Sequence, residues 1–188
     1  MIKYLFIFSI LLMTFSCQQN HSSKTEDKTA KELTVQDSKS KIDSTNVQNI
    51  YIYNKKAYHK KDSILFSGVV TIWHENGELR ETNAYEKGIL DGPRRLWHKN
   101  GNLFQEGTYK DGQIIGLRRV WHKNGVLSDE GFYVNGVLNG SRKSWYENGN
   151  IRRELTYSNG KVEGLVKKYN EEGKLIEEKT FINGKLSN

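Results

Sequence analysis

The sequence predicts an all-β protein, namely an elongated, single-layer antiparallel sheet of tandem β-hairpins. Two observations support this. First, a 24-residue pattern occurs five times without insertion or deletion, and such a fixed period is typical of arrays whose units pack on their neighbours. Second, only about eight to ten residues separate successive glycines, which suits strands and is short for a capped helix. The predicted units are 68–91, 92–115, 116–139, 140–163 and 164–188.

Residues 1–16 have the plan of a secretory signal peptide. A basic start at Lys3 is followed by an apolar run to Phe15 and by the small residue Ser16. The run is too short for a membrane-spanning helix, since a bilayer needs about 20 apolar residues. Residues 14–17 resemble a bacterial lipobox, so we expect Cys17 to become the lipidated first residue of the mature protein. Cys17 is the single cysteine of the chain, which excludes an internal disulfide.

Residues 17–49 are expected to be the lipidated cysteine and a disordered linker. The segment is rich in Ser, Thr, Lys, Gln, Asp and Asn and contains too few large apolar residues to bury a core. A flexible chain of this length would hold the sheet about 30 Å from its anchor. Gln18 after the cysteine resembles lipoproteins sent to the outer membrane.

Both ends of the array are expected to differ from its middle, because a terminal unit has a neighbour on one side only. Residues 50–67 contain Tyr51, Tyr53, Tyr58 and Phe66 outside the repeat register, so we expect one or two strands that cap the first unit. At the other end, the last unit has tyrosine in place of tryptophan and Glu172 in place of asparagine.

An aromatic residue stands five positions after the glycine that opens each unit. This aromatic ladder is Trp73, Trp97, Trp121, Trp145 and Tyr169. All four tryptophans of the chain lie in this register. We therefore interpret the ladder as part of the repeat and not as a separate cofactor site.

Asn-Gly dipeptides at 76/77, 100/101, 124/125 and 148/149 predict the turn inside each hairpin. Both residues tolerate the positive φ of a two-residue type I′ turn, which we favour. A three-residue turn with a bulge is the alternative, and it would pair Arg94 with Glu106 and bring Trp97 over Leu103. The second turn, between hairpins, is expected at Gly88, 111/112, 135/136, 159/160 and 183/184.

The two-residue turn predicts which residues of the two strands pair with each other. It places basic residues opposite glutamates in four units and Thr71 opposite Thr82 in the first. The charged pairs are Arg95 with Glu106, Arg119 with Glu130, Lys143 with Glu154, and Lys167 with Glu178. Such pairs favour a sheet by roughly 0.2 to 1 kcal/mol each.

The pattern Gly-x4-Trp/Tyr-x3-Gly-x-Leu-x5-Tyr-x2-Gly-x3-Gly resembles the bacterial MORN-repeat variant, over Gly68 to Asn188. The resemblance implies an array of hairpins with an interaction role and supplies no catalytic residues. The family is often described as antitoxin-like, so the resemblance implies an antitoxin or immunity protein as one alternative function.

Neither a metal site nor an enzyme is expected. His74, His98 and His122 stand next to tryptophans, but equivalent residues lie about 10 Å apart. Zinc ligands lie about 2.0 to 2.1 Å from the metal, so these histidines cannot share one ion. No nucleophilic triad, paired carboxylates or phosphate loop stands outside the repeat landmarks, and we expect no cofactor.

The formal net charge of +7 raises the possibility of nucleic acid or anionic lipid as a partner. Secretion argues against nucleic acid. The opposing glutamates are our main explanation of the basic residues, and a weak contact with an anionic surface is the alternative. We expect a non-catalytic lipoprotein of the bacterial envelope, at the outer membrane, that acts as a scaffold for a protein partner. The candidate partner surface is His98, His122, Arg95 and Arg119. A module that binds glycans or lipid headgroups through the aromatic ladder is a further alternative.

Overall fold

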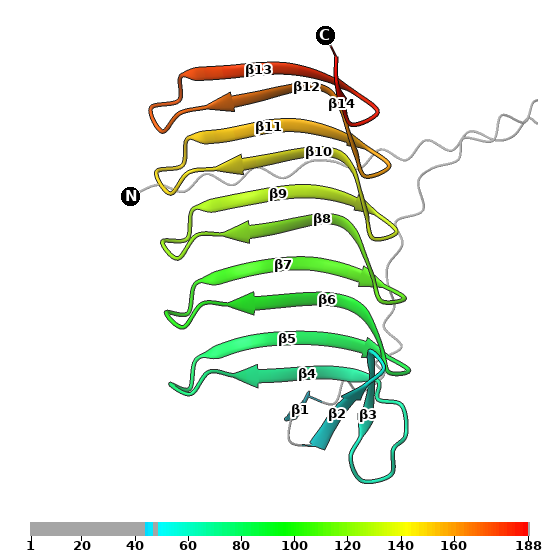
Figure 1. The fold of residues 1–188 in the computed structure, drawn as a ribbon. Coiled ribbons are helices and arrows are strands. Elements are labelled where there is room, and N and C mark those ends of the chain that lie inside the picture. Colours follow the sequence, from blue (N-terminus) through cyan, green and yellow to red (C-terminus); the bar gives the residue numbers. More distant parts are fainter. Residues whose placement is uncertain (1–43, 47–48, 188) are drawn as a thin grey trace, which may run out of the picture. The chain divides into compact units, whose positions relative to one another are not determined.

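The computed structural model describes residues 44–46 and 49–187 (Figure 1). These residues form a 12-stranded sheet in the order β1-β4-β5-β6-β7-β8-β9-β10-β11-β12-β13-β14, and a two-stranded sheet of β2 and β3. No α-helix occurs among them. Each hairpin lies beside the next one in the chain, so the predicted antiparallel sheet of tandem hairpins is confirmed.

Five hairpins make up the large sheet. They are β4 (Gly68–Trp73) with β5 (Leu79–Glu86), β6 (Ile89–Trp97) with β7 (Leu103–Lys110), β8 (Gln113–Trp121) with β9 (Leu127–Val134), β10 (Val137–Trp145) with β11 (Ile151–Ser158), and β12 (Lys161–Tyr169) with β13 (Leu175–Ile182). The short β14 (Lys185–Leu186) pairs with β13 at one edge of the sheet.

At the other edge β1 (Ser44–Asn46) pairs in parallel with β4. This strand lies inside segment 17–49, which was expected to be a disordered linker. Pairing at a sheet edge uses backbone groups, which every residue except proline carries in full, so a polar composition does not prevent it.

The turns between hairpins are the type I′ turns. At β5–β6 both turn residues have positive φ, Lys87 at 48° and Gly88 at 77°, and Glu86 pairs directly with Ile89. Asp111 and Gly112 repeat this arrangement, with φ of 50° and 78°. Two-residue turns of this type match the twist of the strands that they join.

The turns inside the hairpins have three residues, so the favoured two-residue turn at Asn100-Gly101 is wrong. The carbonyl of His98 accepts from the N–H of Gly101 (3.0 Å), and the N–H of His98 donates to the carbonyl of Asn102 (2.8 Å). Only Gly101 has a positive φ, 84°, whereas Asn100 does not. This is a type I turn followed by a glycine in the left-handed region, the usual three-residue hairpin.

The predicted register of the strands is nevertheless confirmed. Arg95 pairs with Glu106, as that register predicts. The register shifts between Leu96 and Trp97, so Trp97 pairs with Leu103, as the three-residue alternative predicts. The shift places Phe104 as an extra residue on β7, a β-bulge. The extra residue of the loop is thus offset by the extra residue of the bulge, and the alternative pairing of Arg94 with Glu106 does not form.

Each long strand bends at the glycine that opens the repeat. Tyr85 pairs with Leu90 and Asn83 with Arg94, so residues 91–93 lie opposite the single residue Ala84. Gly92 has a φ of 113°, which side-chain-bearing residues rarely adopt. The bend turns the sheet at this end of the strands (Figure 1).

The segment before the first hairpin forms a small cap. β2 (Ile50–Tyr53) pairs with β3 (Lys56–His59), and Ile50, Ala57 and Phe66 form a buried cluster with Val70 of β4. Backbone bonds attach the cap to the turn at Lys87-Gly88, since the Ala57 N–H donates to Gly88 O (2.8 Å) and the Gly88 N–H donates to Phe66 O (2.7 Å). Among the described residues this is the one buried apolar cluster of the fold.

Candidate interaction surface

The sheet presents two faces, because successive side chains of a strand point to opposite sides. We call them by their aromatic residues. The Trp face carries Trp97, Arg95 and their equivalents, and the Tyr face carries Tyr109, Arg94 and their equivalents. Arg95 pairs with Glu106, while Arg94 pairs with Gly107 and Gly92 with Tyr109, which fixes these side chains to opposite faces.

A row of ion pairs crosses the Trp face. Each pair joins the two strands of one hairpin at the predicted positions. The pairs are Arg95–Glu106 (3.6 Å), Arg119–Glu130 (2.6 Å), Lys143–Glu154 (2.9 Å) and Lys167–Glu178 (3.8 Å). Arg119 also lies 3.4 Å from Glu106 and so links two hairpins. The row is therefore balanced in charge.

The ion pairs change the ionisation of their members. The pKa of the Glu154 carboxyl is lowered, mainly by the hydrogen bond from Lys143, and in part by the hydroxyl of Tyr169. The pKa of Arg119 is raised, chiefly by its hydrogen bond to Glu130.

The aromatic ladder stands beside this row on the Trp face. Each member pairs with an aliphatic residue on the neighbouring strand, as Trp97 does with Leu103 and Trp121 with Leu127. The outermost, Trp73, is 56% exposed and the others are half-buried. Tyr169 donates its hydroxyl to Glu154 (2.9 Å), so this member also belongs to the ion-pair row.

The histidines join consecutive hairpins. The Nε2 of His98 donates to the carbonyl of Trp121, 23 residues further on (3.2 Å). His74 donates in the same way to Trp97 (3.0 Å), and His122 to Trp145 (3.0 Å). In the next hairpin Tyr146 stands at the histidine position, and its hydroxyl donates to the carbonyl of Tyr169 (2.8 Å).

The asparagines of the Asn-Gly turns form a second series of such links. Asn100 Nδ2 donates to the carbonyl of Lys123 (2.9 Å), and Asn124 Nδ2 to that of Glu147 (2.8 Å). Asn76 and Asn148 do the same with Lys99 and Glu171. The loops are thus joined along one edge of the array.

The four residues of the candidate partner surface do not lie together. Arg95 and Arg119 are on the Trp face. His98 directly follows Trp97, so its side chain lies on the opposite face. There the centre of its ring lies 4.9 Å from that of the Phe104 ring. His98 and His122 each have Nε2 bound to a backbone carbonyl, so they hold neighbouring hairpins together.

On the Tyr face, arginines pair with a polar residue 13 positions earlier in the chain. Arg94 donates to Glu81 (2.8 Å), Arg118 to Gln105 (2.5 Å) and Arg142 to Asp129 (3.0 Å). Burial acts to lower the pKa of Arg94, but the hydrogen bond and charge of Glu81, together with Tyr109, outweigh it and the pKa is raised. The same balance raises the pKa of Arg142 beside Asp129.

Three segments of the chain match the family model of the MORN repeat variant, at residues 90–111, 138–159 and 162–183. Each match covers one hairpin, β6–β7, β10–β11 or β12–β13, in the phase of the 24-residue period. Over these hairpins the chain is similar to MORN repeats. MORN repeats are in general repeats that contact proteins or membranes. A comparison with the curated proteins gives no match.

Several predicted features fall outside the described residues, among them the signal peptide, Cys17 and most of the linker. In the part of the chain that the structure describes, no helix is long and apolar enough to cross a membrane. In that same part, no three His, Cys, Asp or Glu side chains gather as a set that could hold a metal ion.

Proposed function

We propose that the protein is a non-catalytic scaffold that presents equivalent side chains of consecutive hairpins to one extended protein partner. The observation that carries this proposal is the repetition of one surface. Four successive hairpins carry the same ion pair at the same place on the Trp face, and hydrogen bonds between repeats hold the hairpins in a fixed order.

Repetition of this kind suits an extended contact. Equivalent residues recur about every 10 Å, since each hairpin adds two strands at about 4.8 Å. A partner that engages several such positions gains affinity from many weak contacts. A catalytic centre instead requires one arrangement that differs from its neighbours.

The scaffold predicts that binding is distributed. After a partner is captured from native membranes with tagged protein, Arg95→Ala, Arg119→Ala and Lys143→Ala should each weaken its binding modestly, since each removes one contact of several. Lys61→Ala, an exposed change in the cap, is the matched control and should have no effect. If one substitution abolished binding while the others were silent, a discrete site would replace the scaffold.

The anchor is the second part of the proposal. We place the scaffold at the outer membrane of a bacterial envelope through lipid on Cys17, on the basis of the apolar run and Ser16 before it. Metabolic labelling with a fatty-acid analogue should mark the wild-type protein and not Cys17→Ser. Equal labelling of both proteins would rule out this anchor.

A further inference from the structure

One hairpin reverses the charge pattern of the Tyr face. In each of the first three hairpins, a polar side chain accepts a hydrogen bond from the arginine that stands 13 residues later in the chain. These acceptors are Glu81, Gln105 and Asp129. In the fourth hairpin this position is Arg153, and the residue 13 positions later is Val166. Arg153 therefore stands where the other hairpins carry the hydrogen-bond acceptor, and the apolar Val166 stands where they carry the arginine donor.

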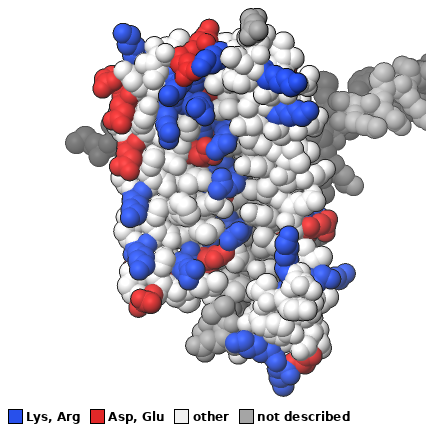
Figure 2. All heavy atoms as spheres, viewed as in Figure 1, with Lys and Arg blue, Asp and Glu red and all other residues white. Residues whose placement is uncertain are grey.

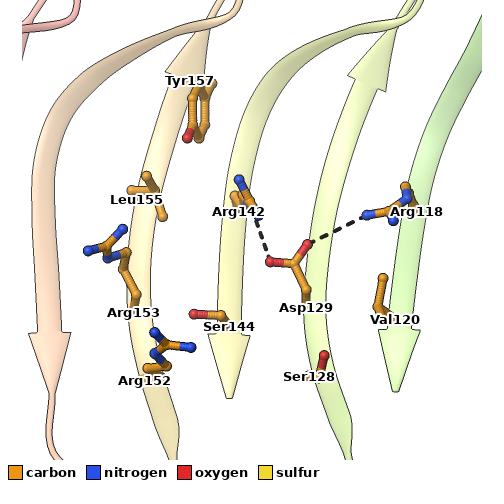
Figure 3. A pocket seen from close by; sticks show the side chains of 10 residues that line it. All are labelled: Arg118, Val120, Ser128, Asp129, Arg142, Ser144, Arg152, Arg153, Leu155 and Tyr157. Carbon is orange, nitrogen blue, oxygen red and sulfur yellow. Dashed lines mark hydrogen bonds and ion pairs between the residues drawn. The ribbon is translucent and has the colours of Figure 1, made fainter. Parts of the chain in front are cut away.

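A cavity of about 400 Å³ lies at this reversal (Figure 3). Its charged walls come from β8, β9, β10 and β11. They are Arg118, Asp129, Arg142, Arg152 and Arg153. Ser144 adds a hydroxyl, and Figure 3 shows Arg152 extending toward it across the gap between β11 and β10.

The charges of the cavity do not balance. Its single carboxylate, Asp129, already lies 3.0 Å from Arg142 and 3.9 Å from Arg118. Among the described residues, no carboxylate lies within 4.0 Å of the guanidinium of Arg152 or of Arg153. Arg152 instead lies 5.9 Å from the centre of the Tyr146 ring. Figure 2 shows Lys and Arg side chains gathered across this face of the sheet.

The cavity continues across the next strand. A second cavity of about 230 Å³ shares Arg153, Leu155 and Tyr157 with the first and reaches Lys168 of β12. Glu177 and Lys179 of β13 also line it and form an ion pair with each other, so cations still outnumber carboxylates. Lys168 is the direct neighbour of Arg153 in the sheet. The two cavities form one trough, with cationic groups on both sides of the apolar side chain of Leu155.

We propose that this trough binds an acidic segment of a partner protein. Carboxylates of the segment would meet Arg152 on one side and Arg153 with Lys168 on the other, while an apolar side chain packs on Leu155. Guanidinium groups match carboxylates in geometry, and such charge-assisted bonds are strong. Two separated cationic positions around an apolar floor fit a chain with several single charges better than one compact anion. The trough lies on the face opposite Arg95 and Arg119, so its occupancy is independent of the Trp-face scaffold.

The test is binding of a fluorescein-labelled peptide of glutamate and leucine residues, measured by anisotropy, with a glutamine-for-glutamate peptide as control. The wild-type protein should bind the acidic peptide and not the control. The double variant R152Q/R153Q should bind it at least about tenfold more weakly, the effect of losing one or two charge-assisted bonds. R153E, which restores the acid of the other hairpins, should do the same.

The matched control is K61Q, which removes one exposed charge from the cap and should leave the affinity for the peptide unchanged. Both positions of the double variant are exposed, so circular dichroism should show wild-type folding. The proposal fails if K61Q weakens binding as much as R152Q/R153Q, or if the glutamine peptide binds equally. It also fails if vesicles containing phosphatidylglycerol bind through Arg152 and Arg153 while the peptide does not.

Discussion

The same dipeptide makes two different turns in this protein. In Asn135-Gly136 both residues have positive φ, 49° and 80°, whereas in Asn124-Gly125 only the glycine does, at 86°. The side chain of Asn124 accepts from the N–H of Val126 (3.0 Å) and donates to the carbonyl of Glu147 (2.8 Å). Through these bonds Asn124 holds its own loop and links it to the next hairpin. A two-residue turn would not need such a link.

Gly125→Val should destabilise the protein by more than about 1 kcal/mol, because a β-branched residue is strained at positive φ. No atom lies closer than 3.8 Å to the place of an added Cβ, so the cost comes from the backbone and not from crowding. The measurement is the urea midpoint of unfolding.

Gly125→Asn is the matched control, since asparagine enters the left-handed region more readily than other residues. It should cost clearly less than Gly125→Val. A midpoint that is unchanged in the valine variant would contradict the turn that the structure shows.

At the scale of the hairpin, the charge pattern predicted the register better than the turn signal did. Arg95 and Glu106 report directly on which residues face each other, and they pair as expected. The Asn-Gly signal reports only a local preference, which two loop lengths share. The compensating bulge at Phe104 could not be predicted, because no residue type is required there: the equivalent positions are Arg80, Ser128, Arg152 and Ile176.

The ion-pair row should make stability depend on acidity. The pKa of Glu154 is lowered in the folded protein from an ordinary value of 4.5, first by the bond from Lys143. Its contribution is therefore present above pH 4.5 and is lost as the pH falls through the lowered pKa. Glu154→Gln should reduce stability at pH 7 by up to about 1 kcal/mol, as for a partly exposed pair.

The same substitution should flatten the fall in stability below pH 4.5, measured as urea midpoints across the acid range. Glu171→Gln is the control, since among the described residues the side chain of Glu171 makes no ion pair. An identical acid profile in wild type and Glu154→Gln would show that the pair contributes nothing.

At the scale of the whole sheet, the hydrogen-bonded links explain why the last hairpin departs from the pattern. The histidine and asparagine positions are Asn170 and Glu172 there. Among the described residues, the short β14 is the only strand after β12–β13, and no hairpin there offers carbonyls to these side chains. Asn170 turns inward and accepts from the N–H of Lys174 (2.8 Å).

The first hairpin departs for a different reason. Val70 stands where later hairpins carry Arg94, Arg118 and Arg142, and it is 4% exposed because the cap covers it. A charged side chain would lose its hydration there without a partner.

Removing one whole repeat, residues 116–139, should shorten the sheet without unfolding it. The acceptors of the links are backbone carbonyls, so Asn100 would meet the carbonyl of Glu147, which Asn124 binds now, in place of that of Lys123. Circular dichroism should retain its β signal, and urea should give one transition at a lower midpoint, because one neighbour interface is lost.

Removing half a repeat, residues 116–127, is the control. It joins a strand to the wrong turn type, and it should abolish cooperative unfolding. If both deletions behaved alike, stability would not depend on the 24-residue phase.

The candidate surfaces were harder to predict than the fold. Contacts between His98 and Trp121, or between Asn100 and Lys123, join a side chain to a backbone carbonyl, which has no signature in the sequence. The sequence therefore predicts His98 and His122 as part of a partner surface, whereas both bind backbone carbonyls of the next hairpin. The trough does have a signal, the arginine at position 153 where other repeats carry Glu, Gln or Asp, but its meaning depends on knowing which residues face it.

The links between hairpins also have a direction. In every link from a histidine or asparagine side chain to a backbone carbonyl, the donor belongs to the earlier hairpin and the acceptor to the later one. During synthesis, each hairpin that leaves the ribosome therefore meets donors that are already in place on its predecessor. The array is suited to assemble in the order in which it is translated, one hairpin at a time, from the cap toward β13.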